Sequence, residues 1–178
     1  MTDLIILAAL FGAPKHGYAL KKQAGMLVGR NAVHNNLVYP ILRRFVLNGW
    51  VLRKSTPGLR GQTREVYSLT GKGKAELLRR LAIFGPKEAA SENEFRLRVG
   101  LFSFLDAETR LRVLGEREQW LAARDARCAR LQENVELGDW GSEVVRFLRA
   151  QTRTERQWIR SLEAKARKKV RLQKKGTQ

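Results

Sequence analysis

A helix-like segment followed by two β-prone runs, between Asn36 and Thr70, constrains the fold of this 178-residue chain most strongly. The helix-like segment ends at Gly49, because glycine adopts the left-handed backbone conformation without the steric penalty of a Cβ. The two β-prone runs, residues 50–56 and 63–69, alternate apolar and polar residues around a loop with turn-forming glycine and proline. We predict a short helix followed by a β-hairpin, although the same pattern also fits an ordinary helix and hairpin of an α+β domain.

The formal net charge of +18 is unevenly distributed along the chain. Residues 1–82 carry 14 basic and 3 acidic side chains, residues 83–164 carry 14 of each, and residues 165–178 carry 7 basic and no acidic ones. A basic module beside an electroneutral one is typical of a protein surface that binds a polyanion. Nucleic acid is the leading candidate for that partner.

Three motifs follow one another in the first half of the chain: HGYAL at residues 16–20, LVYPILRRF at residues 37–45 with Gly49, and VYSLTGKG at residues 66–73. In this order and at this spacing they resemble the PadR family of bacterial winged-helix transcriptional regulators. The resemblance covers the first half closely and the second half only in general character. The chain departs from the family pattern at Leu37, where a small hydroxyl-bearing residue is usual, and at residues 46–48, where an acidic run is common.

The resemblance and the residue pattern together predict a mainly α fold with a small β-hairpin. We expect an N-terminal winged helix-turn-helix DNA-binding domain over residues 1–84, a helical dimerisation domain over residues 85–164 and a basic tail over residues 165–178. In the first domain we expect a buried helix over residues 2–11 capped by Thr2, a second helix over residues 15–27, a third over residues 36–48, and a fourth capped by Thr70.

The second half reads as helices that pack on other helices. We expect a helix over residues 94–105, a longer one capped by Asp106, and a third after residues 138–141. The longer helix repeats an apolar residue every seven positions, and the third carries a further apolar stripe; the residues are Leu114, Leu121, Cys128 and Val135, then Val145, Leu148, Ile159 and Leu162. The apolar surface predicts a homodimer, which the resemblance also implies, with a monomeric helical subdomain as the alternative.

The third helix supplies the candidates for base recognition. If Val38, Ile41, Leu42 and Phe45 are buried, helical geometry places Asn36, Pro40, Arg43 and Leu47 on the opposite side, with Arg44 and Tyr39 on its flanks. Arginine bonds guanine and asparagine bonds adenine in a bidentate manner, so Arg43 and Asn36 are the predicted base readers. Pro40 is expected near the helix start, where its missing N–H matters least. The resemblance implies that Tyr39 bonds a phosphate.

Basic residues outside that helix are candidates for contacts with the DNA backbone, which contribute affinity and little sequence information. The predicted hairpin tip spans residues 60–64, and the second predicted helix begins at residue 15. The DNA-binding candidates outside the third helix are Arg53, Arg60, Gln62, Arg64, Lys15 and Lys22. Arg43 and Arg44 also fit a merely solvated basic face of a helix.

The remaining residue types exclude several classes of protein. A single cysteine forms no internal disulfide, which fits a cytoplasmic protein, and the longest apolar run near the N-terminus is too short to cross a bilayer. Two histidines without clustered carboxylates offer no metal site, and no catalytic constellation or cofactor motif is present, so we predict neither an enzyme nor a cofactor. Trp120 and Trp158 are candidates for binding a small aromatic effector, a property that the resemblance implies.

The sequence therefore predicts a homodimeric, sequence-specific DNA-binding regulator, a repressor of transcription that acts on a pseudo-palindromic operator in the cytoplasm. Two other classes fit the same residues. One is a sequence-indifferent nucleic-acid-binding or chaperone-like protein whose affinity comes from the basic tail. The other is a protein-interaction adaptor that keeps a winged-helix fold.

Overall fold

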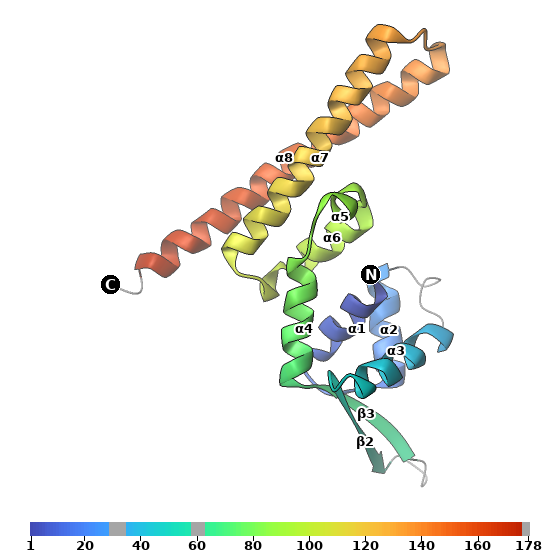
Figure 1. The fold of residues 1–178 in the computed structure, drawn as a ribbon, viewed down its shortest axis with the longest axis vertical. Coiled ribbons are helices and arrows are strands. Elements are labelled where there is room, and N and C mark those ends of the chain that lie inside the picture. The colour runs from blue at the N-terminus through green and yellow to red at the C-terminus, as the bar shows by residue number, and fades with distance from the viewer. Residues whose placement is uncertain (29–34, 58–62, 176–178) are drawn as a thin grey trace. The chain divides into compact units, whose positions relative to one another are not determined.

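The computed structural model describes residues 1–28, 35–57 and 63–175, and for residues 24–28, 35–36 and 169–175 it describes the backbone alone. The chain divides into two units, Met1–Ile83 and Phe84–Gln178 (Figure 1). The predicted fold class is confirmed: the first unit is a winged helix and the second consists of helices. None of the described helices combines the length and the apolar composition that crossing a membrane requires.

Helix α1 (Thr2–Leu10) forms the centre of the first unit, as its nearly continuous apolar sequence predicts. Most of its side chains are buried, namely those of Leu4, Ile5, Ile6, Leu7, Ala9 and Leu10. The predicted cap was wrong: Thr2 lies inside the helix and Met1 occupies the cap position without a side-chain hydrogen bond. The apolar character of α1 therefore stabilises it through burial and not through capping.

Helices α2 (Gly17–Val28) and α3 (Asn35–Leu47) form the helix-turn-helix pair. Val38, Leu42 and Phe45 are completely buried and Ile41 is half-buried, so the predicted inner face of α3 is confirmed. Pro40, which we expected near the helix start, lies in the interior of α3. Its missing N–H leaves the carbonyl four residues earlier without the usual helical partner.

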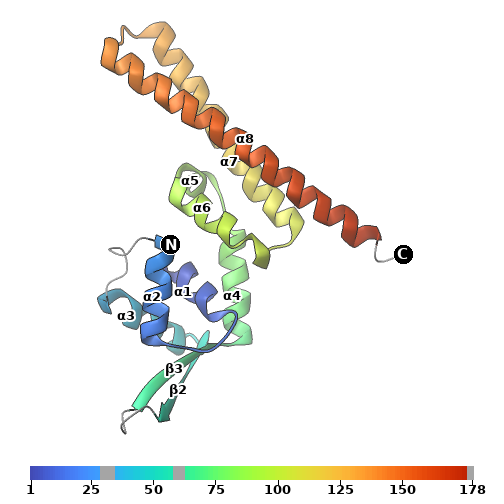
Figure 2. The same ribbon diagram turned by 180° about the vertical axis from the view of Figure 1, so that it is seen from behind.

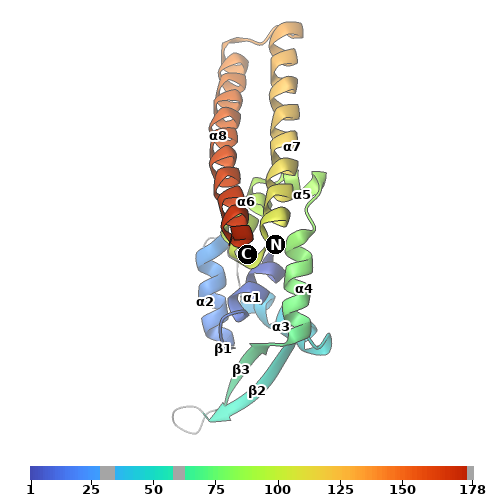
Figure 3. The ribbon, with the colours of Figure 1, turned by 90° about the vertical axis from the view of Figure 1, so that its left-hand side faces the viewer.

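The strands β2 (Val51–Pro57) and β3 (Thr63–Leu69) pair in an antiparallel hairpin that projects from the helices of the first unit (Figure 3). Gly49 has a φ of 70°, which confirms its predicted role at the helix end. A third strand, β1 (Lys15–His16), pairs with β3 and gives the sheet order β1-β3-β2. The second helix therefore begins at Gly17, and the prediction that Lys15 lies in it was wrong.

Helix α4 (Gly71–Ala82) follows β3 directly. The Thr70 hydroxyl accepts a hydrogen bond from the Gly73 amide at 2.9 Å, so the predicted cap is confirmed. The same hydroxyl lies within hydrogen-bond distance of the carbonyl oxygens of Gly49 and Trp50. Helix α4 packs closely at this end: a Cβ added at Gly73 would lie only 2.1 Å from the carbonyl oxygen of Trp50.

In the second unit, short helices precede two long ones. They are α5 (Pro86–Ala90), α6 (Glu92–Gly100), the 3₁₀ helix η2 (Phe102–Phe104), α7 (Ala107–Asn134) and α8 (Asp139–Lys175). The predicted single helix over residues 94–105 was wrong, because the helix stops at Gly100. The Arg110 guanidinium donates to the carbonyl oxygens of Phe102 and Leu105 and thereby stabilises the tighter turn that follows. Asp106 caps α7 as predicted, accepting from the Thr109 amide at 2.7 Å.

The long helices α7 and α8 lie side by side (Figure 2). Leu114, Leu121 and Cys128 are buried as predicted, but Val135 is 49% exposed because α7 ends one residue earlier. On α8, Val145 and Ile159 are buried and Leu148 and Leu162 half-buried. Helix α8 continues to Lys175, so residues 165–175 of the predicted tail are helical.

Polar pairs connect α7 to α8 along their length. Arg117 is only 1% exposed and donates to both carboxylate oxygens of Glu155, at 2.8 and 2.9 Å, and to the carbonyl oxygen of Ala89. Arg124 bonds the hydroxyl of Thr152. The other connections are Arg149 with Asp125 and Arg156 with Glu118. Each pair joins one particular position of α7 to one of α8, so the set defines the register of the two helices.

Candidate nucleic-acid interface

The outer face of α3 combines a cation with apolar and aromatic side chains. Pro40 and Arg43 are exposed, Tyr39 is 44% exposed and Leu47 is 86% exposed. These residues lie opposite the buried face of Val38, Leu42 and Phe45, which anchors the helix in the core. The predicted outer face of α3 is therefore available to a ligand at every position whose side chain is described.

Two open hollows flank Tyr39, between α3 and the hairpin. The larger, of about 560 Å³, is lined by Tyr39, Arg43, Val46, Leu47, Arg53, Glu65 and Tyr67. The other, of about 540 Å³, is lined by His16, Gly17, Tyr18, Ala19, Tyr39, Thr63, Arg64, Glu65 and Tyr67. Tyr39, Glu65 and Tyr67 line both hollows, and we refer to the two hollows together as the α3–hairpin groove.

Gly17 and Tyr39 determine the shape of the second hollow. A Cβ at Gly17 would lie 2.9 Å from Cε1 of the Tyr39 ring, so glycine allows the start of α2 to approach α3 closely. The ring nitrogen Nδ1 of His16 lies 3.3 Å from the carbonyl oxygen of Glu65, and thus links β1 to β3. Tyr18, 74% exposed at the edge of this hollow, was absent from our predicted site although it stands in the HGYAL motif that could have indicated it.

Within the groove, Arg53 has an acidic partner, whereas Arg43 has none among the described side chains. Arg53 lies 3.3 Å from Glu65, whose other oxygen accepts from the Ser55 hydroxyl at 2.8 Å. Arg43 makes no ion pair or hydrogen bond with the described side chains, and it is exposed. Burial raises the pKa of the Tyr67 hydroxyl, and the Glu65 charge adds to this effect, so Tyr67 stays protonated in the wall of the groove.

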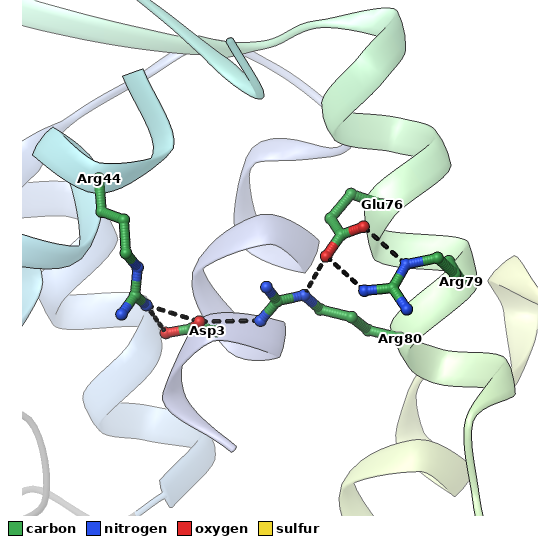
Figure 4. Close-up of polar contacts among 5 residues, drawn as sticks. All are labelled: Asp3, Arg44, Glu76, Arg79 and Arg80. Atoms are coloured by element: carbon green, nitrogen blue, oxygen red, sulfur yellow. Dashed lines mark hydrogen bonds and ion pairs between the residues drawn. The ribbon is translucent and has the colours of Figure 1, made fainter. Parts of the chain in front are cut away.

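Arg44, the neighbour of Arg43, points toward α1 and not into the groove (Figure 4). Its Nη2 donates to both carboxylate oxygens of Asp3, at 2.7 and 2.6 Å. Asp3 also accepts from Nη1 of Arg80 at 2.9 Å. Hydrogen bonds from Arg79, together with Arg80, lower the pKa of Glu76 to about 2, so this carboxylate stays ionised and holds Arg80 from the other side.

The remaining predicted DNA contacts are dispersed. Arg64 is exposed on β3 at the rim of the second hollow, Lys22 is exposed on α2, and Lys15 is half-buried on β1. Arg60 and Gln62, at the predicted hairpin tip, lie outside the described residues, and Asn36 lies in the part of α3 whose backbone alone is described. The structure therefore gathers Tyr39, Arg43, Arg53 and Arg64 along one groove.

The two tryptophans predicted to bind an effector have different surroundings. The Trp120 ring lies under two guanidinium groups, with Arg117 at 4.7 Å and Arg124 at 5.1 Å from its centroid. Trp158 is 36% exposed and meets the Phe95 ring edge to face, with the centroids 5.8 Å apart. Trp120 thus already serves as a cation–π partner, whereas part of the Trp158 ring is accessible.

The comparisons with solved structures cover either part or most of this chain. A comparison with curated proteins gives no match. A solved structure from Thermoplasma acidophilum described as a transcriptional regulator is 32% identical, covers 43% of this chain and 72% of that chain, and has a TM-score of 0.40. Bacillus subtilis PadR with operator DNA is 19% identical over 92% of this chain and 98% of that chain (TM-score 0.45). The structure of the same protein with p-coumaric acid is 18% identical, covers 92% of this chain and 97% of that chain, and has a TM-score of 0.41.

The family model described as "Transcriptional regulator PadR-like family" matches residues 6–79. The matched residues include α2, α3 and the hairpin, which are the elements that form the α3–hairpin groove. The motifs, the winged-helix fold and this match agree, and the chain belongs to the PadR-like family of transcriptional regulators.

Proposed function

We propose that this protein is a sequence-specific DNA-binding repressor of transcription that acts in the cytoplasm as a homodimer on a pseudo-palindromic operator. The observation that supports it best is the exposed Arg43 on the outer face of α3, which pairs with none of the described side chains and lies beside a groove with two further arginines, Arg53 and Arg64. A helix of this size fits the major groove of DNA, where base edges carry a unique pattern of donors and acceptors.

The residues of the groove divide into two roles. Arg43 reads a guanine, because its guanidinium matches the two acceptors on the major-groove edge of that base. The hydroxyl groups of Tyr39 and Tyr18, together with Arg53 and Arg64 on the hairpin, bind phosphates and orient the helix. Arg53 keeps Glu65 as a partner, which orients its guanidinium within the groove.

Replacing Arg43 with alanine should weaken binding to the preferred operator by ~1 to 3 kcal/mol and binding to random duplex much less, because a bidentate base contact discriminates between sequences. The preferred site comes from selecting bound sequences out of a random duplex pool at near-physiological salt, and fluorescence anisotropy then gives both affinities. Lys72→Ala is the control, since it removes an exposed cation from α4 of the same unit. Equal losses on both duplexes would reduce Arg43 to a phosphate contact.

The same selection separates the competing functions. A shared inverted repeat in the selected pool supports the homodimeric regulator. A sequence-indifferent nucleic-acid-binding protein shows a ratio of specific to random affinity near one with a steep salt dependence, whereas specific regulators commonly reach ~10³ or more. A protein-interaction adaptor on a winged-helix fold binds neither duplex.

An exposed apolar stripe on α8 supports the homodimer. Trp140, Val144 and Phe147 are 85%, 57% and 64% exposed, and their spacing of four and three residues puts them on one side of the helix. The face of α8 with Val145 and Ile159 is already buried in the second unit. Helix α8 therefore has a second apolar seam, and a second copy of the chain that packs along it would remove this surface from water.

Replacing Phe147 with glutamate should raise the dissociation constant of the dimer by ~100-fold or more, because each dimer loses the burial of two phenyl rings and gains two carboxylates to desolvate. Light scattering coupled to size-exclusion chromatography at micromolar concentration measures the change. Gln157→Glu is the control, since Gln157 is exposed on α8 away from the stripe and the charge change is the same. A wild-type chain that is monomeric under these conditions would remove the dimer and the palindromic operator together.

We further propose that a small aromatic effector relieves repression by stacking on the accessible part of Trp158 on α8. The aromatic edge of Phe95 and the exposed Trp158 ring suit a planar ligand. With p-coumaric acid as the probe, tryptophan fluorescence should be quenched saturably, and Trp158→Phe should abolish the saturable part. Trp140→Phe, which removes a more exposed tryptophan, should keep it. Quenching that survives Trp158→Phe would exclude this site.

A further inference from the structure

Asp3 connects three elements of the first unit that are distant in the sequence. It lies in the first turn of α1, accepts from Arg44 of α3 with both oxygens, and accepts from Arg80 of α4 with one of them (Figure 4). The Asp3 side chain is 23% exposed, whereas that of Arg44 is 53% exposed. A partly shielded carboxylate thus holds an arginine that would otherwise be free in solvent.

The neighbouring groups reinforce this hold. The Arg80 guanidinium donates through Nε to Glu76 and lies 4.9 Å from the centroid of the Trp50 ring. The Trp50 ring in turn lies 5.5 Å from the ring of Phe45, the residue next to Arg44. Arg80 is therefore fixed on three sides, and it presents Asp3 to α3 in one orientation. Nη2 of Arg44 donates to both oxygens of that carboxylate, and hydrogen bonds between two charged groups are stronger than those between neutral groups.

We propose that Asp3 is a positioning residue for DNA recognition: it holds Arg44 on the protein and leaves the adjacent Arg43 as the arginine of α3 that is available to DNA. This inference rests on the proposed function. Successive residues of a helix point about 100° apart, so Arg43 faces the α3–hairpin groove while Arg44 reaches Asp3. A free Arg44 would add a phosphate contact that carries no sequence information, and it would raise binding to random DNA at least as much as binding to an operator.

Four full-length proteins test this: the wild type, Asp3→Asn, Arg44→Gln and the double variant. The measurement is the slope of log K against log salt for a random duplex, by fluorescence anisotropy. Asp3→Asn should steepen the slope by ~0.9, the value for one additional phosphate contact in B-DNA. Arg44→Gln should leave the wild-type slope unchanged, and the double variant should return to it, because the added contact is that of Arg44. On the selected operator, Asp3→Asn should lower the ratio of specific to random affinity.

Glu92→Gln is the charge control, since it also removes one carboxylate that pairs with an exposed arginine, in the second unit. A slope that steepens equally in Glu92→Gln would mean that net charge alone is responsible and would overturn the proposal. A shallower slope in Arg44→Gln would overturn it too, because Arg44 would then already contact phosphate in the wild type. Thermal unfolding shows whether each variant is folded. If Asp3→Asn is unfolded, the salt slope of Arg44→Gln alone tests the proposal: an unchanged slope supports it and a shallower slope overturns it.

The failure of this inference is distinguishable from that of the proposed function. The slopes on random duplex can be measured without a preferred sequence. If the wild type shows no sequence preference, the proposed regulator is refuted, and the slopes still test whether Asp3 holds Arg44 away from DNA. If the wild type prefers an operator but all four proteins show the same salt slope, the role of Asp3 is refuted and the proposed regulator is retained. A wild type that binds no duplex overturns both.

Discussion

Replacing Gly73 with alanine is expected to lower the free energy of unfolding of the first unit by at least ~3 kcal/mol, the upper end of the usual cost of overpacking. A Cβ at this position would lie 2.1 Å from the carbonyl oxygen and 2.9 Å from the carbonyl carbon of Trp50. These are backbone atoms and cannot rotate away, so α4 must move relative to the hairpin or lose the Thr70 cap. Urea unfolding followed by circular dichroism and by tryptophan fluorescence measures the change.

Gly71→Ala is the matched control for Gly73→Ala. Gly71 is in the first turn of the same helix, and a Cβ there meets nothing within 4 Å. The Gly71→Ala protein should be more stable than the wild type, by less than ~1 kcal/mol, because alanine loses less backbone entropy on folding than glycine. Similar stability of the Gly73→Ala and Gly71→Ala proteins would contradict the close packing of α4 on Trp50.

Replacing Arg117 with leucine is expected to destabilise the second unit by ~3 to 5 kcal/mol, because removing one member of a buried ion pair leaves the other charge without compensation. Arg117 is 1% exposed and its Glu155 partner 11% exposed by side chain. The carbonyl oxygen of Ala89 loses its donor as well, the Phe95 ring loses the cation Arg117, and the Trp120 ring loses Arg117 and keeps Arg124. Urea unfolding of the full chain, followed by helical circular dichroism, measures the loss.

Two comparisons test the cause of this destabilisation. Arg96→Leu breaks an ion pair that is 60% and 38% exposed, and should change the stability by less than ~1 kcal/mol. The double variant with leucine at positions 117 and 155 should recover part of the loss, because it removes the unpaired carboxylate. If Arg117→Leu were as stable as Arg96→Leu, the pair with Glu155 would contribute little to the α7–α8 packing.

Features that depend on neighbouring residues in the chain were predictable from the sequence. The period of Val38, Leu42 and Phe45 identifies the inner face of α3, since one helix turn separates them. Gly49 and the caps Thr70 and Asp106 satisfy backbone requirements within a few residues, so their chemistry is local as well. For the same reason Arg43 could be identified as an outward-facing candidate before its surroundings were known.

Other features depend on segments that meet only in the folded chain. The two-residue strand β1 exists because Lys15 and His16 pair with Tyr67 and Val66, and such a short run has no pattern of its own. The cations above Trp120 also depend on the folded chain. The sequence identifies Trp120 only as an apolar residue, but the guanidinium groups of Arg117 and Arg124 lie over its ring. The exposed stripe of Trp140, Val144 and Phe147 follows from which face of α8 the second unit buries.

Arg43 and Arg44 show what the sequence predicts and what only the tertiary structure determines. The sequence by itself determined the fold class, the outward side of α3 and the excess of basic over acidic residues in the first 82 positions, because these follow from local periodicity, capping and composition. It could not distinguish two adjacent arginines. Only the tertiary structure decided that Arg44 pairs with Asp3, 41 residues away, while Arg43 lines the groove and forms no ion pair with the side chains that the structure describes, since an ion pair depends on distance in space.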